Sequence, residues 1–168
     1  MAPKVREPFH PLLKASEIED SMDTFPHFLD AKAIKSHSYM SDILGLKGLG
    51  VVKVNLPAGN NSCTPHYHLN TAEWLYILKG TGHLILIDAS TDCPPFKPDS
   101  SKPLPTTAHV PKVELPTEER EVGPGDFIGL PGGTVSARWT HTLRAGQGGL
   151  EYLMGGERAV VDVVGYPT

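Results

Sequence analysis

The sequence predicts an all-β fold of the sandwich or barrel kind. The apolar runs are short, they are rich in Val, Ile, Leu and aromatic residues, and each is bounded by Gly, Pro or Asn. The chain of 168 residues holds 17 glycines and 16 prolines, which supply these boundaries. Short apolar segments at regular spacing with turn residues between them are typical of all-β proteins, whereas alternating strands and helices would need longer periodic segments.

Residues 1–45 differ from the rest of the chain. The stretches "HPLLKASEIEDSM" at 10–22 and "SYMSDILGL" at 38–46 each predict a short helical turn, because neither has the long apolar period of a full helix. We expect residues 1–45 to form an N-terminal arm wrapped over the barrel. A separate functional segment is the alternative.

The barrel itself is expected over residues 46–168. Strand-length segments occur in this order: 49–56, 73–78, 83–88, 126–130, 150–154 and 159–164. The segment 90–118 holds seven of the sixteen prolines and is predicted to be a long surface loop, because proline is excluded from central strands. Loops of this length are either binding loops or lids, or they are disordered, and the sequence favours neither.

Composition excludes several classes of function. A net charge of −4 with no extended Lys/Arg cluster argues against a nucleic-acid partner, and the apolar runs are too short to span a membrane. The N-terminus carries charges and prolines where a secretory signal needs an apolar stretch. Two cysteines, Cys63 and Cys93, make at most one bridge, so we expect a cytoplasmic protein with reduced thiols.

The stretch "TPHYHLNTAEWLYILKG" carries the candidate chemistry. In a strand, His66 and His68 share one face and Tyr67 points to the other. Glu73 follows the short turn "LNTA", and an antiparallel return would bring its carboxylate back to the histidine pair. Two imidazoles and one carboxylate leave positions open on a metal ion, as in catalytic sites. The alternative is a solvated strand face with a surface acid.

The spacing of these residues resembles the first conserved motif of the cupin superfamily, carried here by Gly59, His66, His68, Glu73 and Gly80. The second cupin motif follows as Gly125, Pro131 and Gly133. The first gap is six residues where five is usual. The resemblance covers roughly residues 50–165, and within the superfamily this sequence is similar to small single-domain cupins. It implies a double-stranded β-helix barrel, often dimeric, with a divalent metal (Zn, Mn, Fe or Ni) held by the motif histidines and glutamate.

One position departs from this pattern. The second cupin motif normally supplies a third histidine, and Ser136 stands at that position. If a strand runs through this segment, Ser136 and Arg138 share the interior face and His141 points outward. A bulge would reverse the direction of His141, so a fourth ligand at His141 stays an open alternative.

Arg138 facing a metal ion raises an electrostatic conflict. Two unit charges at 4 Å interact by about 4 kcal/mol at an effective dielectric of 20, so a dication would repel the guanidinium about twice as strongly. Arg138 at the barrel mouth, an anionic substrate between the two charges, or an Arg138–Glu73 ion pair without metal would each relieve it. We hypothesise the anionic substrate, bound by the guanidinium. A strand-end salt bridge is the alternative role for Arg138.

Two classes of function follow. The first is a metal-dependent enzyme acting on a small acidic or enolisable metabolite, with the ion as Lewis acid or dioxygen-binding centre. His66, His68 and Glu73 would bind the ion, Arg138 would bind substrate charge, and Ser136 or water would take the vacant position. Oxygenase, isomerase, decarboxylase and cyclase activities are not distinguished. The second class is a non-catalytic cupin that binds a small ligand or only forms a homodimer, with a degraded metal site.

Overall fold

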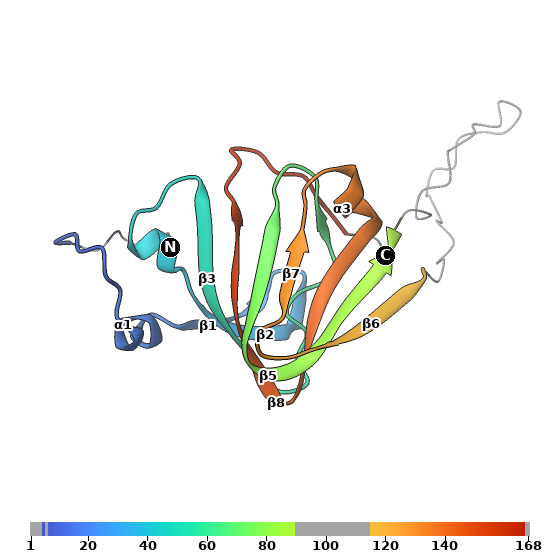
Figure 1. Cartoon of the computed structure of the whole chain (residues 1–168), viewed down its shortest axis with the longest axis horizontal. Helices are drawn as coiled ribbons and strands as arrows, with labels where there is room; N and C mark the ends of the chain where they lie inside the picture. Colours follow the sequence, from blue (N-terminus) through green and yellow to red (C-terminus); the bar gives the residue numbers. More distant parts are fainter. Residues whose placement is uncertain (1–4, 6, 90–114, 167–168) are drawn as a thin grey trace, which may run out of the picture.

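The computed structural model describes residues 5, 7–89 and 115–166, and strands make up far more of these residues than helices do (Figure 1). The greater part of the predicted proline-rich loop, and Cys93 within it, lies outside the described residues. Within these described ranges, three short helices accompany the strands: α1 (Ala15–Asp20), α2 (Met40–Ile43) and α3 (Thr134–Arg138). None of the helices in the described ranges has the length and apolar character that crossing a membrane requires.

The strands of the described residues are β1 (Asp23–His27), β2 (Asp30–Ser38), β3 (Leu49–Leu56), β4 (Tyr67–His68), β5 (Glu73–Asp88), β6 (Thr117–Val122), β7 (Phe127–Leu130), β8 (Trp139–Glu157) and β9 (Val164–Gly165). The large sheet has the order β1-β2-β3-β8-β5-β6, β7 also pairs with β5, and β4 pairs with β9 in a second small sheet. Every pairing is antiparallel. The predicted double-stranded β-helix of the jelly-roll kind is confirmed.

The core forms because the strand residues alternate between two faces. In β3, Val52, Val54 and Leu56 are buried while the residues between them are not. In β5, Ile77 is fully buried, whereas its neighbour Tyr76 is 40% exposed. Glu73, four residues before Ile77, therefore begins β5 on the interior face.

The two long strands β5 and β8 bend together to close the barrel. Their register shifts near Gly80, which has a φ of +82°. A Cβ atom at Gly80 would lie 2.2 Å from the carbonyl oxygen of Gly149, so the close approach of the two strands requires glycine here. The segments 73–78 and 83–88, which the sequence suggested as two strands, are thus one bent strand.

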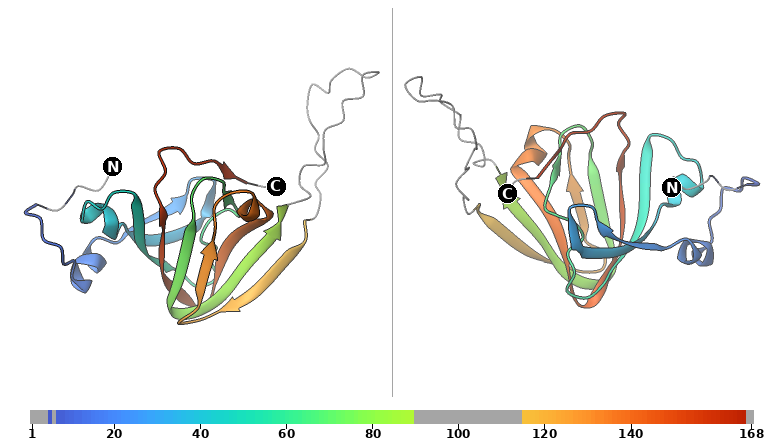
Figure 2. Two further views of the ribbon diagram at one scale, coloured as in Figure 1. Left: turned by 45° about the horizontal axis from the view of Figure 1, so that its top comes forward. Right: turned by 180° about the vertical axis from the view of Figure 1, so that it is seen from behind.

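The N-terminal segment contributes more than the sequence suggested. Both predicted helical turns are present as α1 and α2, but the residues between them form the hairpin β1–β2, whose second strand pairs with β3. The sequence of this hairpin mixes charged and apolar residues, as edge strands do, and gave no clear strand signal. Seen from behind, the hairpin lies across the near side of the barrel (Figure 2). At the other end of the chain, only Val164 of the predicted strand 159–164 is in a strand.

Candidate metal centre

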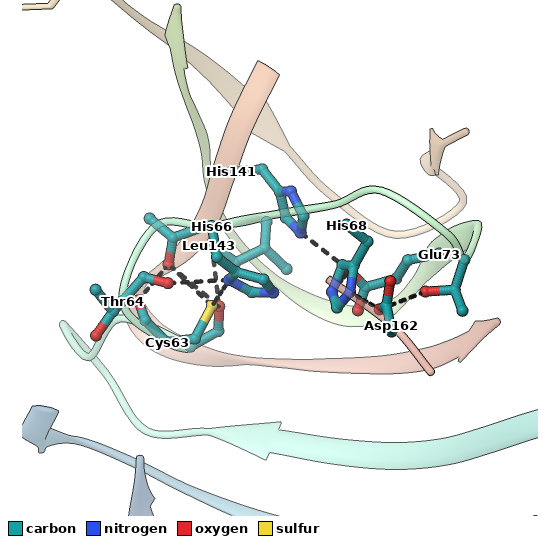
Figure 3. Close-up of polar contacts among 11 residues, drawn as sticks. Cys63, Thr64, His66, His68, Glu73, His141, Leu143 and Asp162 are labelled. Atoms are coloured by element: carbon teal, nitrogen blue, oxygen red, sulfur yellow. Dashed lines mark hydrogen bonds and ion pairs between the residues drawn. The ribbon is translucent and has the colours of Figure 1, made fainter. Parts of the chain in front are cut away.

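Four polar side chains meet inside the barrel near one end of β5 (Figure 3). Glu73 is the first residue of β5, and His68 is the last residue of the short strand β4. His66 precedes β4, and His141 lies near the start of β8. Three separate segments of the chain therefore supply the four groups.

Backbone pairing explains why His66 and His141 are adjacent. The two residues form an isolated antiparallel bridge, in which His66 N–H donates to the His141 carbonyl at 3.2 Å and His141 N–H donates to the His66 carbonyl at 2.9 Å. Directly opposed residues of an antiparallel pair place their side chains on the same face. The two imidazole rings accordingly lie with their centroids 4.8 Å apart.

The expectation that His141 points out of the barrel is wrong. It assumed one strand from Ser136 to His141, but helix α3 occupies residues 134–138 and β8 begins only at Trp139. Alternation counted across a helix has no meaning. Counted within β8, His141 shares its face with Leu143 and Ala145, which are both buried. That apolar alternation is a sequence signal that could have identified His141.

The ligand atoms are close enough to share one ion. His66, Glu73 and His141 each offer a ligand atom within 4.8 Å of the others. His141 Nε2 donates a hydrogen bond to Glu73 Oε2 at 3.0 Å, and His68 Nε2 lies 3.8 Å from the same oxygen. The rings of His66 and His68 have centroids 5.0 Å apart. Glu73 is thus the common neighbour of the group.

Hydrogen bonds fix two of the rings with one nitrogen turned away from the centre. His66 Nδ1 donates to the carbonyl of Thr64 at 3.0 Å, and His68 Nδ1 donates to Asp162 Oδ2 at 2.6 Å. In each ring Nε2 is then the atom that carries the free lone pair. Metal-binding histidines are commonly held in this way, through a carbonyl or carboxylate on the other nitrogen.

Asp162 is a site residue that the sequence did not indicate. Besides His68, its carboxylate accepts hydrogen bonds from Thr71 Oγ1 at 2.8 Å and from the backbone N–H of Asn70 at 3.1 Å. It therefore ties the C-terminal segment to the turn that follows His68. The sequence places Asp162 in the apolar run "AVVDVV", 94 residues from His68, so only its position as the lone acid of that run could have drawn notice.

Both acids are held as carboxylates. Burial raises the pKa of Glu73. The hydrogen bond from His141 and the electrostatic interactions with the three surrounding histidines lower it by more, so the pKa lies below its ordinary value. Burial likewise raises the pKa of Asp162, and the bonds from His68, Thr71 and Asn70 outweigh it, again giving a lowered pKa. The site offers negative charge at neutral pH, as a cation requires.

These residues fit a divalent cation. Their donor set of imidazole nitrogens and one carboxylate suits Mn, Fe, Ni and Zn. They line one end of a cavity of about 430 Å³, large enough for a small ligand beside an ion. His141 Nδ1 is buried with no hydrogen-bond partner among the described residues. The atom of this ring that faces Glu73 is Nε2, so the unpaired Nδ1 is not part of the donor set.

Ser136, predicted to stand at the vacant ligand position, lies elsewhere. It is buried in α3 and lines a separate small cavity together with Leu84, Ile128 and Trp139. It is not among the described residues that line the histidine cavity. The reason is again the helix, which turns residue 136 away from the position that a strand would give it.

Arg138 does not face the interior, contrary to the strand-based expectation. Its side chain is 58% exposed, its Nε donates to Asp88 Oδ2 at 3.3 Å, and its guanidinium lies over the ring of Trp139, 5.2 Å from the centroid. This geometry matches the alternative role suggested for Arg138 by the sequence, a salt bridge at the end of a strand. The predicted role of Arg138 in substrate binding stays a prediction, without support from this placement.

Comparison with known families gives one match. The model of the family described as Cupin matches residues 34–140, which is more than half of the chain. No curated protein matches the chain at a significant level.

Several solved structures have the same fold. A proposed sugar phosphate isomerase from Acidithiobacillus ferrooxidans is 25% identical, with a TM-score of 0.70 over 93% of this chain and 80% of its own. A sugar phosphate isomerase of the cupin superfamily from Silicibacter pomeroyi is 22% identical, with a TM-score of 0.61 over 88% of this chain and 78% of its own. A mutant of Bacillus subtilis oxalate decarboxylase is 17% identical at a TM-score of 0.50, and the chain covers 29% of that larger protein.

Proposed function

Since the chain belongs to the cupin family, we propose that it is a metal-dependent enzyme acting on a small acidic or enolisable metabolite. The proposed ligands are His66, His68, Glu73 and His141. The observation that carries the proposal is the convergence of three imidazoles on one partly buried carboxylate in the lining of a cavity. Structural metal sites are closed on all sides, whereas this group opens into the cavity, which favours catalysis.

The roles of the side chains follow from their contacts. Thr64 and Asp162 fix the rings of His66 and His68, so that their Nε2 atoms are preorganised toward the centre. Glu73 supplies the negative charge. A divalent cation held there would act as a Lewis acid on a carbonyl or enolate oxygen. Leu75, Leu84 and Leu143 line the same cavity and make part of its wall apolar.

A more specific candidate is the isomerisation of a sugar phosphate. The observation that favours it is the similarity to the Acidithiobacillus protein, which is described as a proposed sugar phosphate isomerase and is 25% identical over 93% of this chain. Such a substrate is small enough for a cavity of about 430 Å³. It also carries a phosphate dianion, which the cavity would have to bind.

The rival proposal is a cupin that binds a small ligand without catalysis. Its main argument was the missing third histidine of the second motif, and His141 beside Glu73 weakens that argument. A homodimer and a cytoplasmic location remain predictions.

Metal loading of tag-free protein tests the first proposal. The chelated protein is reloaded with Mn, Fe, Ni or Zn in turn, and its metal content and thermal midpoint are measured. We expect a stoichiometric amount of at least one metal and a raised midpoint, because an ion that binds only the native state stabilises it by about 2.7 kcal/mol at 100 times its Kd. His66→Ala should abolish both effects.

The matched control is His83→Ala, which removes a half-buried histidine of β5 that does not line the cavity. This variant should load metal like the wild type. Only trace metal in the wild type after reloading would refute the proposal. Turnover of sugar phosphates or small oxo acids by the loaded protein, absent in His66→Ala, separates the enzyme from the non-catalytic rival.

A further inference from the structure

The cavity that holds the candidate metal centre has a second polar group in its lining. His27, Phe28 and Lys35, from the hairpin β1–β2, line it together with Tyr166 from the C-terminal segment. Phe28 is 78% exposed, so this part of the lining reaches the molecular surface. The hairpin that the sequence did not predict as strand thus completes the wall of the cavity.

Lys35 is a half-buried cation without an acidic partner. Among the residues that the structure describes, no carboxylate lies within ion-pair distance of its ammonium group. Exposed lysines need no partner, but a half-buried lysine in the lining of a cavity has three donors available to a ligand of that cavity. The other lysine of the same strand, Lys32, is exposed and does not line this cavity.

His27 adds a neutral donor beside this lysine. The backbone N–H of Leu29 donates to His27 Nδ1 at 3.3 Å, which leaves Nε2 to carry the ring proton. Burial lowers the pKa of His27, and the like charges of Lys35 and His66 lower it further against the opposing effect of Asp30. His27 and Lys35 line the same cavity as the candidate metal centre.

The charge of the lining favours an anion. Glu73 is the carboxylate of the described lining, and a bound divalent cation together with Lys35 would exceed its single negative charge. A ligand that carries negative charge restores the balance. Phe28 and Tyr166, whose rings are 6.2 Å apart in an edge-on arrangement, supply an apolar wall next to the donors.

We propose that Lys35, assisted by His27, binds the anionic head group of a small substrate whose reacting end lies at the histidine–glutamate centre. The head group is a phosphate or a carboxylate, since an ammonium group binds either through charge-assisted hydrogen bonds. This inference rests on the proposed function and names its substrate class. It also replaces Arg138, which pairs with Asp88 outside the cavity, as the cationic residue that binds substrate.

The test uses full-length protein both reloaded with metal, as the charge balance requires, and chelated, so that binding at Lys35 is distinguished from binding through the metal. Inorganic phosphate and, separately, malonate are titrated at constant ionic strength while the thermal midpoint is followed. The wild-type midpoint should rise with at least one of the two anions, and the anion with the larger effect identifies the head group. Lys35→Met should weaken the apparent Kd at least about tenfold, the lower end of the range expected for the loss of one hydrogen bond to a charged group.

Two variants make the result specific. Lys32→Met removes an equal charge from the same strand and should respond like the wild type, whereas Lys35→Arg should keep most of the response. If Lys35→Met does not fold, His27→Phe carries the same test at the neighbouring donor. A wild-type response in Lys35→Met, an equal loss in Lys32→Met, or no response of the wild type to either anion would overturn the inference.

Metal loading of the same variants keeps the two proposals apart. Lys35→Met should bind metal like the wild type, because Lys35 is not one of the proposed ligands. A protein that binds the anions through Lys35 but binds no metal would refute the proposed function and leave the anion site standing. A protein that binds metal but binds neither anion would refute the anion site and leave the proposed metal centre standing.

Discussion

Asp162 is the residue on which the orientation of His68 depends. Its carboxylate lies 2.6 Å from His68 Nδ1 and also accepts from Thr71 and Asn70, so one side chain joins the C-terminal segment to the candidate metal centre. A carboxylate in this position fixes the tautomer of the imidazole and raises its basicity as a ligand. The effect on metal binding should therefore exceed the effect on folding.

Asp162→Asn should weaken metal affinity about 10- to 100-fold, the usual effect of removing such a partner. The side chain keeps its size and one oxygen, so the fold should persist. Metal affinity, measured by competition with a chromogenic chelator, is the readout.

The control for this substitution is Asp126→Asn. Asp126 also accepts a backbone hydrogen bond, from Gly123 N–H at 2.8 Å, but it lies in the turn before β7. This variant should bind metal with unchanged affinity. Equal affinities for wild type and Asp162→Asn would show that Asp162 does not position the ligand.

At the scale of the elements, the bend in β5 and β8 decides whether the barrel closes. Gly80 and Gly59 both have positive φ values, +82° and +75°, so alanine is strained at either position. They differ in space: a Cβ at Gly80 meets the backbone of Gly149 and Leu150, whereas nothing lies within 4 Å of one at Gly59. Comparing alanine variants at these two glycines therefore distinguishes the cost of backbone strain from the cost of the steric clash between β5 and β8.

Gly59→Ala should destabilise the protein by about 1–2 kcal/mol, the cost of the left-handed conformation for a residue with a side chain. Gly80→Ala should cost at least about 3 kcal/mol, because the collision adds to that strain. The free energy of unfolding in urea measures both. Equal losses in the two variants would mean that β5 and β8 can separate at Gly80 without cost.

At the scale of the whole molecule, the hairpin β1–β2 makes stability depend on pH. His37 of β2 is 4% exposed, neither ring nitrogen has a hydrogen-bond partner among the described residues, and it packs edge-on against Phe25 and Tyr39. Burial lowers the pKa of His37, and Lys35 lowers it further against the opposing effect of Asp23. Folded His37 therefore binds protons less readily than His37 in the unfolded chain.

The sign of the effect follows from proton linkage. Where the unfolded chain binds more protons, stability rises with pH, so the contribution of His37 is present above its unfolded pKa of about 6.5 and is lost as the pH falls below it. His37→Phe keeps a packed ring and removes the titration. Its free energy of unfolding in urea should fall less than that of the wild type between about pH 7.5 and pH 5.5.

His83→Phe serves as the control, because it removes a histidine of β5 and leaves His37 in place. Its pH dependence should follow the wild type. Identical pH dependence in His37→Phe and the wild type would contradict the assigned role of His37.

Local pattern was enough for much of the fold. The segment 49–56 shows the two-residue apolar period of a half-buried strand, and β3 has those bounds. The motif spacing that resembles cupins is confirmed by the family match. Local pattern was weakest for the hairpin β1–β2, where polar edge strands show little periodicity, and for helix α3, which invalidated the strand count from Ser136 to His141.

The sequence by itself determined the class of fold and brought His66, His68 and Glu73 together, because those three residues lie on one short stretch whose alternation and turn are readable locally. Only the tertiary structure decided that His141 and Lys35 line the same cavity and that Asp162 holds His68 in its wall. These residues come from β8, the C-terminal segment and the N-terminal hairpin. Their proximity arises from backbone pairing and packing between segments that are distant in the chain. The local periodicity of apolar residues does not predict such contacts.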